Sequence, residues 1–476
     1  MDYTDLYING QWHHARSGER FDVINPATEE IITSVASADI EDADAALDAC
    51  EAASSLWLAK TPRQRSEILR KAWTLMTERL EDFAHLITLE NGKARADAMG
   101  EATYAAEFFR WFAEEAVRAE GLIMHAPSSG ARIIVQHRPA GIAVLVTPWN
   151  YPAAMGTRKI APALAAGCPV IIKPASETPL TMLALMPLLE EAGVPAGMIN
   201  VLPSKRSGKL VDHLLHDRRV RVLSFTGSTV VGRKLLHSAA DQVLKPAMEL
   251  GGNAPLIIFE DADINTAVAG AMLAKMRNLG EACTAANRFY VHEAISDEFT
   301  SKFTTAMSAL TMGNGLDSNI DVGPLVNADT RDKVAAFVDD AVAKGATIEL
   351  GGSLPNGRGF FYPPTILSNV PESADCVHDE IFGPVAAIQT FSDENDVIRR
   401  ANSTEYGLVA YVFSEDMARA MRICEQLEYG MVGLNRGLVS DPAAPFGGVK
   451  QSGLGREGGH EGMLEFMETQ YISAQW

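Results

Sequence analysis

The sequence predicts an α/β fold with two helix-covered sheets. From residue 141 onward short apolar strands alternate with helices, and this strand–loop–helix order is typical of βαβ units and a parallel sheet. The alternation restarts at Pro255, which indicates a second α/β domain. The length of 476 residues and the apolar content of 47% provide for a large core, so a disordered or fibrous chain is excluded.

Helices are predicted for the first third of the chain. An alanine-rich amphipathic stretch covers residues 39–59. Thr61 then precedes a proline, which is a common helix start, and apolar side chains recur at steps of three and four residues until Asn91-Gly92 ends that helix. Another helix is expected over residues 95–119.

The strands of the first α/β unit are short apolar runs that lead into polar loops. They are expected at residues 131–137, 141–146, 169–172 and 220–225. Helices should follow the last three, and the helix that begins after Thr178-Pro179 should be capped by Thr178 and kinked at Pro187.

The second unit repeats this pattern, with a helix expected over residues 263–278. Its strands are expected at residues 256–259, 289–292, 408–413 and 431–434. A glycine-rich loop covers residues 445–453, and the tail at 468–475 is expected to form an edge strand that pairs with another subunit.

The charge limits the possible partners. The formal net charge is −20, with 41 Lys and Arg against 61 Asp and Glu, which disfavours general binding to nucleic acid or an anionic membrane. No apolar run reaches the roughly 18 residues of a membrane span, and the N-terminus lacks the basic and apolar regions of a signal peptide. We therefore expect no nucleic-acid partner, no membrane association and a cytoplasmic location.

The five cysteines are odd in number and have no CxxC spacing, so a disulfide framework or zinc finger is not expected and a reduced compartment fits. The paired histidines at 13–14 and the His213 and His216 pair lack neighbouring ligands at metal-binding spacing. The sequence predicts no metal site.

Cys283 is a candidate nucleophile. It lies in a loop of small residues between a predicted helix and a predicted strand, where a ligand could approach the thiol. A thiolate is a strong nucleophile. The alternative is that Cys283 serves as a small buried apolar residue, which is the more frequent role of a lone cysteine.

Three further positions allow both a catalytic and a structural interpretation. Glu249 precedes two glycines and could act as a general base, or it could be a solvated residue at a helix end. Asn150 follows a strand and could donate to an oxyanion, or it could cap a helix. Gly227-Ser228 could open a helix under a pyrophosphate, although the segment fits neither GxGxxG nor the P-loop.

Considered together, these segments resemble the aldehyde dehydrogenase superfamily. The motifs that carry the resemblance occur in the same order and comparable spacing, and they are residues 147–152, 249–252, the Cys283 loop, 380–384 and 445–453. Within the superfamily the chain is most similar to bacterial succinate-semialdehyde dehydrogenases, through residues 157–168, Arg277-Asn278 and residues 450–458.

The resemblance implies a mechanism through a covalent intermediate. Cys283 would attack the aldehyde carbon, and the Asn150 amide with the backbone N–H of Cys283 would hold the oxyanion. Hydride transfer would leave a thioester, which water activated by Glu249 would hydrolyse to a free acid. Ala285 occupies the place of a second cysteine found in some relatives, so no disulfide switch is expected.

The resemblance also implies a nicotinamide cofactor. The residues expected to bind it are Thr147, Pro148, Trp149, Lys173, Ser176, Glu177, Gly227, Ser228, Glu380 and Phe382. Many NAD-preferring relatives carry a glutamate three positions after the lysine, and here Ser176 stands there. We therefore predict NADP. NAD stays possible because the carboxylate of Glu177 lies one residue later, and Ser176 could instead only cap a helix.

Succinate semialdehyde is the expected substrate, and its carboxylate needs cations. Arg158 and Arg277 match the substrate-binding arginines of the family, and Ser452 is a third expected contact. Either arginine could instead belong to a structural ion pair. The alternatives for the whole chain are the same chemistry on glutarate semialdehyde or another aliphatic aldehyde, and a structural homologue without activity.

The resemblance finally implies a domain organisation. A Rossmann-type cofactor-binding domain is expected over residues 1–120 and 140–250, and a second α/β catalytic domain over residues 251–445. A small β oligomerisation arm is expected from residues 121–139 and 459–476, in a homodimer or homotetramer.

Overall fold

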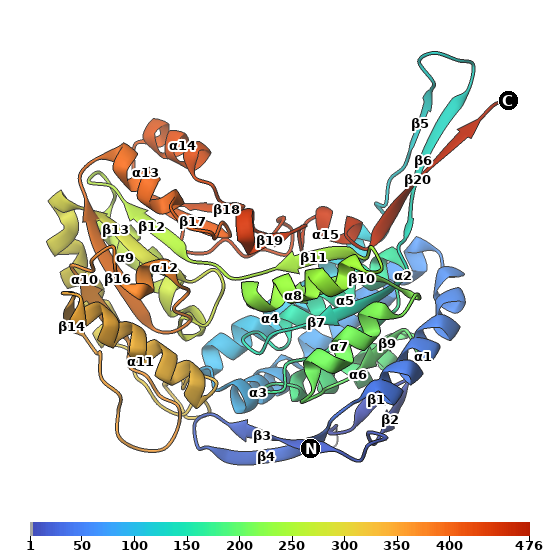
Figure 1. The fold of residues 1–476 in the computed structure, drawn as a ribbon, viewed down its shortest axis with the longest axis horizontal. Coiled ribbons are helices and arrows are strands. Elements are labelled where there is room, and N and C mark those ends of the chain that lie inside the picture. Colours follow the sequence, from blue (N-terminus) through green and yellow to red (C-terminus); the bar gives the residue numbers. More distant parts are fainter. Residues whose placement is uncertain (1–2) are drawn as a thin grey trace.

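Two mixed α/β units lie side by side in the computed structural model, which describes residues 3–476, and a slender β arm extends from the first unit (Figure 1). The predicted α/β class with two sheets is confirmed. Among the described residues, no helix combines the length and the apolarity needed to cross a lipid bilayer.

The first sheet has eight strands in the order β19-β11-β10-β7-β8-β9-β1-β2. Its five central strands run parallel, and shorter antiparallel strands extend both edges. The strands are β1 (Leu6–Ile8), β2 (Gln11–His13), β7 (Ile142–Val146), β8 (Val170–Lys173), β9 (Ile199–Val201), β10 (Val220–Thr226), β11 (Lys245–Glu249) and β19 (Gly453–Leu454).

Helices bury both faces of this sheet because alternate side chains of each strand point to opposite sides. In β7, Ala143 and Leu145 join the core under α5 and α6, whereas Val144 and Val146 join the core under α1, α7 and α8. The helices are α1 (Ile40–Leu58), α2 (Pro62–Glu78), α3 (Leu80–Asn91), α4 (Arg95–Glu115), α5 (Ala154–Ala166), α6 (Leu180–Ala192), α7 (Ser207–His216) and α8 (Thr229–Ala240).

The second sheet has seven strands in the order β14-β15-β16-β13-β12-β17-β18, all parallel except β14. Its strands are β12 (Ala254–Ile258), β13 (Ala286–His292), β14 (Thr347–Leu350), β15 (Thr365–Ser368), β16 (Val385–Phe391), β17 (Val409–Phe413) and β18 (Met431–Leu434). The helices around it are α9 (Ile264–Met276), α10 (Ser296–Ser308), α11 (Ala328–Ala343), α12 (Asp375–His378), α13 (Glu394–Asn402) and α14 (Met417–Gln426).

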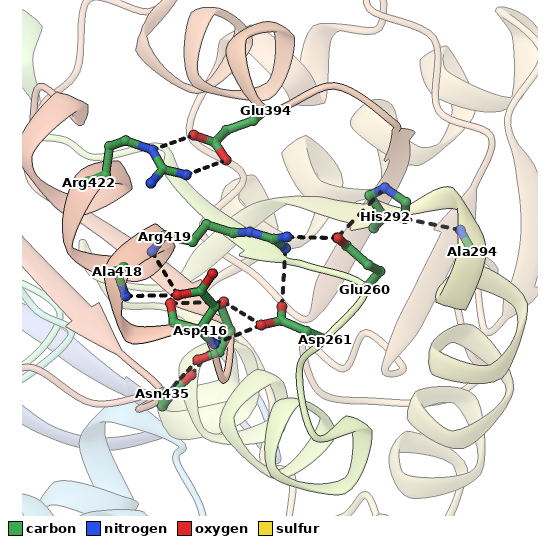
Figure 2. Close-up of polar contacts among 11 residues, drawn as sticks. Glu260, Asp261, His292, Ala294, Glu394, Asp416, Ala418, Arg419, Arg422 and Asn435 are labelled. Carbon is green, nitrogen blue, oxygen red and sulfur yellow. Dashed lines mark hydrogen bonds and ion pairs between the residues drawn. The ribbon is translucent and has the colours of Figure 1, made fainter.

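A network of charged side chains closes the carboxyl ends of β12 and β17 (Figure 2). The Arg419 guanidinium donates to Glu260 at 2.9 Å and to Asp261 at 3.3 Å. Asp261 also accepts from the backbone N–H of Asp416 at 2.7 Å, and Asp416 caps α14 through the backbone N–H of Ala418 and Arg419. The network fastens α14 to the end of the sheet.

The arm is a three-stranded antiparallel sheet in the order β20-β6-β5. It consists of β5 (Leu122–His125), β6 (Arg132–Pro139) and β20 (Met467–Ala474), and β20 follows the short helix α15 (Glu461–Leu464). The strand expected in the tail is therefore present, but within this chain its partner is β6. Its pairing with another subunit stays a prediction.

Several predictions of elements need correction. The single helix expected up to Asn91 is two helices, because the backbone turns at Arg79 (φ −119°, ψ 21°). Thr178 does not cap α6, since its hydroxyl donates to the carbonyl of Trp149. The strands β1 to β4, including the hairpin β3 (Arg20–Asn25) and β4 (Glu30–Ala36), were not predicted, and neither were β9, β11 and β14 to β16.

Candidate active site

A cavity of about 430 Å³ opens where the strands of the first sheet end. The loops after β7, β8 and β10 line it from one side, and loops that precede β13 and β16 line it from the other. The lining includes eleven of the predicted residues, which are Thr147, Pro148, Trp149, Asn150, Lys173, Glu177, Gly227, Ser228, Cys283, Glu380 and Phe382. The structure thus brings together residues that are up to 235 positions apart, from Thr147 to Phe382.

Cys283 faces this cavity from a loop with unusual backbone geometry. Asn278 and Leu279 have positive φ values of 52° and 58°, and Gly280 follows at 75°. A Cβ atom on Gly280 would lie 2.3 Å from the carbonyl oxygen of Gly383, so only glycine allows the two loops to approach this closely. Burial raises the pKa of the Cys283 thiol to about 12, against the opposing charge of Arg158.

Asn150 is held to the cysteine loop through its side chain. Its amide Nδ2 donates to the carbonyl of Glu281 at 2.9 Å, and the Asn278 amide donates to the same carbonyl at 2.9 Å. An amide NH₂ carries two hydrogens, so one remains for a ligand. The side chain lines the cavity together with Cys283, which is the arrangement that an oxyanion donor needs.

Glu249 ends β11, outside the cavity lining. The residue is only 2% exposed, and neither carboxylate oxygen has a hydrogen-bond partner within residues 3–476. Burial, with the charge of Glu457 as the second cause, raises the pKa of Glu249 well above its usual value. A carboxylate with a raised pKa accepts a proton readily and suits a general base.

Arg158 is buried and forms an ion pair with Glu457, which also pairs with Lys159. The Arg158 guanidinium lies 4.3 Å from the ring centroid of Phe446. Because Glu457 already neutralises much of this charge, the alternative of a structural ion pair holds for Arg158 at least in part.

Arg277 has only neutral hydrogen-bond partners among the described residues, which are the hydroxyls of Thr284 at 3.3 Å and Ser440 at 3.5 Å. Ser440 and Phe446 line a second hollow of about 490 Å³. The two arginines thus contact residues of the same hollow, and Arg277 is the one whose charge is available to an anionic ligand.

Ser452 requires a correction. Its side chain is fully buried, and the hydroxyl donates to the carbonyl of Gly251 at 2.7 Å while it accepts from the backbone N–H of Gly407 at 2.9 Å. It lines neither hollow. The expected substrate contact is not supported, because the hydroxyl joins two loops of the second unit instead.

Ser176 also lies outside the cavity lining, and its hydroxyl donates to the carboxylate of Glu177 at 3.1 Å. Glu177 itself lines the cavity together with Lys173. Burial lowers the pKa of Lys173 to about 8, although the charge of Glu177 opposes this shift. Glu177 rather than Ser176 therefore lines the cavity, and a contact of Ser176 with the cofactor stays a prediction.

Comparison with known proteins identifies this arrangement. Residues 12–472 match the model of the aldehyde dehydrogenase family. The chain belongs to this family. The predicted resemblance and the predicted aldehyde dehydrogenase fold are confirmed.

The similar aldehyde dehydrogenases include enzymes of one substrate class. The chain is 54% identical to a succinate-semialdehyde dehydrogenase of Paenarthrobacter nicotinovorans, over 93% of this chain and 98% of the relative. It is 46% identical to an NADP(+) succinate-semialdehyde dehydrogenase of Escherichia coli K12, over 98% of this chain and 96% of the relative. The crystal structure of a Burkholderia pseudomallei succinate-semialdehyde dehydrogenase superposes with a TM-score of 0.97 at 44% identity, covering 99% of this chain and 98% of that chain.

In this aldehyde dehydrogenase, the cavity has the features that a dinucleotide requires. The N-terminus of α8 opens on it beside Gly227 and Ser228, and backbone N–H groups at such an end attract phosphate. The hydroxyl of Thr226 lines it and has no partner among the described residues. An unpaired buried hydroxyl is costly, so a ligand atom is the natural partner.

Glu380 and Phe382 also line the cavity, and Phe382 contacts Trp149. The Glu380 carboxylate accepts from the backbone N–H of Gly252 at 3.0 Å, and burial raises its pKa to about 7. Phe382 has a positive φ of 57°, and its ring meets the Trp149 ring edge-on at 5.3 Å. This strained backbone aims an aromatic ring into the cavity.

Three charged residues near the candidate catalytic residues were not predicted from the sequence. Lys159 and Glu457 surround Arg158, and Lys93 contacts the backbone of Asn150 at 2.7 Å. Glu457 lies inside a segment that carried the resemblance, which was the available signal for it. Lys93 follows the Asn91-Gly92 helix end, and nothing in the local sequence shows that its ammonium is buried.

Proposed function

We propose that this aldehyde dehydrogenase oxidises succinate semialdehyde to succinate with NADP⁺, and that it also accepts NAD⁺. The observation that carries the proposal is that Cys283 shares one cavity with Asn150 and with Glu380 and Phe382, so a nucleophile and an amide donor face the place suited to a nicotinamide. The names of the relatives support the substrate and the cofactor.

The reaction begins when the Cys283 thiol loses its proton to water and the thiolate sulfur bonds to the aldehyde carbon, while the electron pair of the carbonyl double bond moves to the oxygen. The negative charge that develops on the aldehyde oxygen is accepted by the free N–H of Asn150 and by the backbone N–H of Cys283. Glu380 and Phe382 would hold the nicotinamide of NADP⁺, which when bound would supply the acceptor for the hydride that leaves this carbon. Loss of the hydride would leave the acyl group on Cys283 as a thioester. Two moderate barriers thus replace one high barrier.

Hydrolysis of the thioester needs a base, and we assign this role to Glu249. Its carboxylate takes a proton from water, the oxygen of which bonds to the acyl carbon while the carbon–sulfur bond breaks. The acid leaves, and the proton taken by Glu249 passes to the departing sulfur, which restores both the Glu249 carboxylate and the Cys283 thiol. The raised pKa of Glu249 fits proton transfer near neutral pH.

The carboxylate of the substrate would bind at Arg277, which has no carboxylate partner in the described part of the chain. Arg158 adds positive charge that Glu457 partly offsets. Glutarate semialdehyde is the second candidate, since the chain is also 46% identical to a glutarate-semialdehyde dehydrogenase of Pseudomonas putida KT2440. It is one methylene longer and would use the same cation.

The domain organisation, the assembly and the location belong to the proposal. Residues 1–120 and 140–250 form the cofactor-binding domain, 251–445 the catalytic domain, and 121–139 with 459–476 an arm through which a homodimer or homotetramer assembles. We place the enzyme in the cytoplasm. The β5–β6–β20 sheet supports the arm, because β20 is an edge strand with exposed Tyr471 and Ile472 side chains.

The test is a panel of aldehydes with both cofactors, followed by NADPH or NADH absorbance. Succinate semialdehyde with NADP⁺ should give the highest kcat/KM, and Arg277→Met should lower kcat/KM for both semialdehydes but not for butanal. Equal loss for butanal would refute an anion-binding role of Arg277, and a higher kcat/KM for glutarate semialdehyde would establish the second candidate.

A further inference from the structure

Lys93 and Glu101 form a buried ion pair that the proposed reaction does not use. Their charged atoms lie 2.6 Å apart, and the side chains are 1% and 0% exposed. Removing two charges from water is expensive, and such a pair contributes little to stability unless further hydrogen bonds hold it. The other partners of these two side chains therefore indicate what the pair is for.

Those other partners lie in the segment that carries Asn150. The Lys93 ammonium donates to the carbonyl of Asn150 at 2.7 Å. The Glu101 carboxylate accepts from the backbone N–H of Ala153 at 2.8 Å and of Ala154 at 3.2 Å, at the start of α5. The pair thus holds the loop on both sides of its bend. Lys93 bonds to one backbone carbonyl, and Glu101 bonds to two backbone N–H groups.

The cysteine loop is tied to the same point. The Asn278 amide donates to the carbonyl of Asn150 at 3.0 Å and to that of Glu281 at 2.9 Å. The backbone N–H of Asn278 donates to Asp97 at 2.9 Å. Asp97 and Glu101 are four residues apart in α4, so one face of one helix holds both the Asn150 loop and the loop that leads to Cys283.

We propose that the buried Lys93–Glu101 pair positions the oxyanion donor. It fixes the backbone of Asn150, so that the free N–H of the side-chain amide stays directed at the carbon that Cys283 attacks. The inference rests on the proposed role of Asn150. A preorganised donor of this kind contributes about 10²- to 10³-fold to the rate, and it must be held within about 0.5 Å, which a rigid charged clamp achieves and a mobile loop does not.

The test compares the double variant Lys93→Met/Glu101→Gln with Asn150→Ala and with the triple variant. The double variant removes both charges together, which avoids leaving one buried charge without its partner, and the introduced glutamine keeps a side-chain oxygen that accepts from Ala153. We expect kcat/KM for succinate semialdehyde to fall about 10- to 100-fold in the double variant, with KM for NADP⁺ changed less than about threefold.

The decisive readout is non-additivity. If the pair acts through Asn150, the double change should alter kcat/KM less than about twofold once Asn150 is replaced by alanine. The same loss should be seen with butanal, because an effect through Arg277, which lies over the same Tyr151 ring as Lys93, would be confined to anionic aldehydes. The folding of each variant is compared by urea unfolding, with Arg419→Met as a control for loss of an ion pair elsewhere.

Independent losses that multiply in the triple variant would overturn the inference, and so would an unchanged kcat/KM in the double variant. If Asn150 is not the oxyanion donor, the result is different, because Asn150→Ala alone would then leave kcat/KM unchanged. As a second route, Lys93→Arg retains the charge with a different reach and should lower kcat/KM less than the double variant does.

Discussion

The two sheets of the molecule have the same central topology but end differently. In the first, the chain builds β7, β8 and β9 in one direction and returns to place β10 and then β11 on the other side of β7. In the second, β12, β13 and β16 extend one way and β17 and β18 return beside β12. In such sheets ligands bind outside the carboxyl ends of the strands where the order reverses.

At this point the first sheet has a largely apolar cavity, whereas the second has ion pairs beside an open hollow of about 380 Å³ that Asp261, Lys302 and Glu415 line. The loops after β7 and β10 line about 430 Å³ of space and leave the Thr226 hydroxyl unpaired. The loops after β12 and β17 are closed by Arg419 between Glu260 and Asp261 (Figure 2). In the second unit it is the amino ends of the strands that face the shared cavity, since Cys283 precedes β13 and Glu380 precedes β16.

The comparison shows that the same strand topology creates a possible ligand site in both sheets, and that the side chains at this site determine whether a ligand can bind. Where the strand order reverses in the second sheet, opposite charges pair with one another, so these residues stabilise the fold. Polar groups without protein partners, such as Thr226, leave the corresponding point of the first sheet open to a ligand. If this division holds, substitutions at the cavity should change activity, and substitutions at the end of the second sheet should change only stability.

The largest effect is expected at the nucleophile. Cys283→Ala should lower kcat by about 10⁴-fold or more, because no other thiol lines the cavity among the described residues. NADP⁺ binding, measured by fluorescence titration, and the urea midpoint should stay unchanged. Residual turnover above about 1% of the parent rate would place the chemistry elsewhere.

Glu249→Gln separates the two halves of the reaction. The amide keeps the shape but accepts no proton, so hydrolysis should slow by about 10²- to 10⁴-fold while the first hydride transfer survives. Rapid mixing should then show a burst of about one NADPH per active site, followed by a very slow phase. Loss of the burst as well would assign Glu249 to the first half.

The pH dependence follows from the buried thiol. Only the thiolate reacts, and a pKa raised to about 12 leaves a small thiolate fraction at neutral pH that grows about tenfold with each pH unit. Alkylation of Cys283 by iodoacetamide should therefore accelerate steadily from about pH 7 to about pH 9. A plateau below about pH 8 would mean that the thiol is ionised by a neighbour.

The cofactor choice should respond to Glu177. Its carboxylate lines the cavity beside Lys173, so it would repel a 2′-phosphate. Glu177→Gln should shift the ratio of kcat/KM values toward NADP⁺ by about tenfold. The matched control is Ser176→Ala, which leaves the charge in place and should change the ratio less than about twofold; a larger change would restore a direct role for Ser176.

The smallest effect on activity is expected at the closed end of the second sheet. Arg419→Met removes two partly buried ion pairs and should lower the free energy of unfolding by about 1 kcal/mol. The kcat/KM values for aldehyde and cofactor should remain within about twofold of the parent. A strong loss of activity would contradict the conclusion that the first sheet carries the active site and that this end of the second sheet is only structural.

Much of the fold could be predicted because the buried strands are continuous apolar runs and the helices have clear ends. Thr61 caps α2 as expected, with a reciprocal bond from Gln64. Among the strands that were not predicted, β1, β2, β9, β14 and β15 are only three or four residues long, and β3, β4 and β11 contain polar residues. The apolar strand β16 was not predicted either. The strand character of these segments comes from hydrogen bonds to distant partners, which local periodicity does not reveal.

The sequence by itself determined the α/β class and the family, and it indicated Cys283, Glu249 and Asn150 as candidate catalytic residues, because long motifs retain their order along the chain. Only the tertiary structure decided that Ser452 is a buried link, that Glu177 and not Ser176 faces the cavity, and that Lys93 supports Asn150. The physical reason is that the role of a polar side chain depends on whether its hydrogen-bonding capacity is already satisfied. In this molecule the satisfying partners lie far away in the chain, as Gly251 does for Ser452.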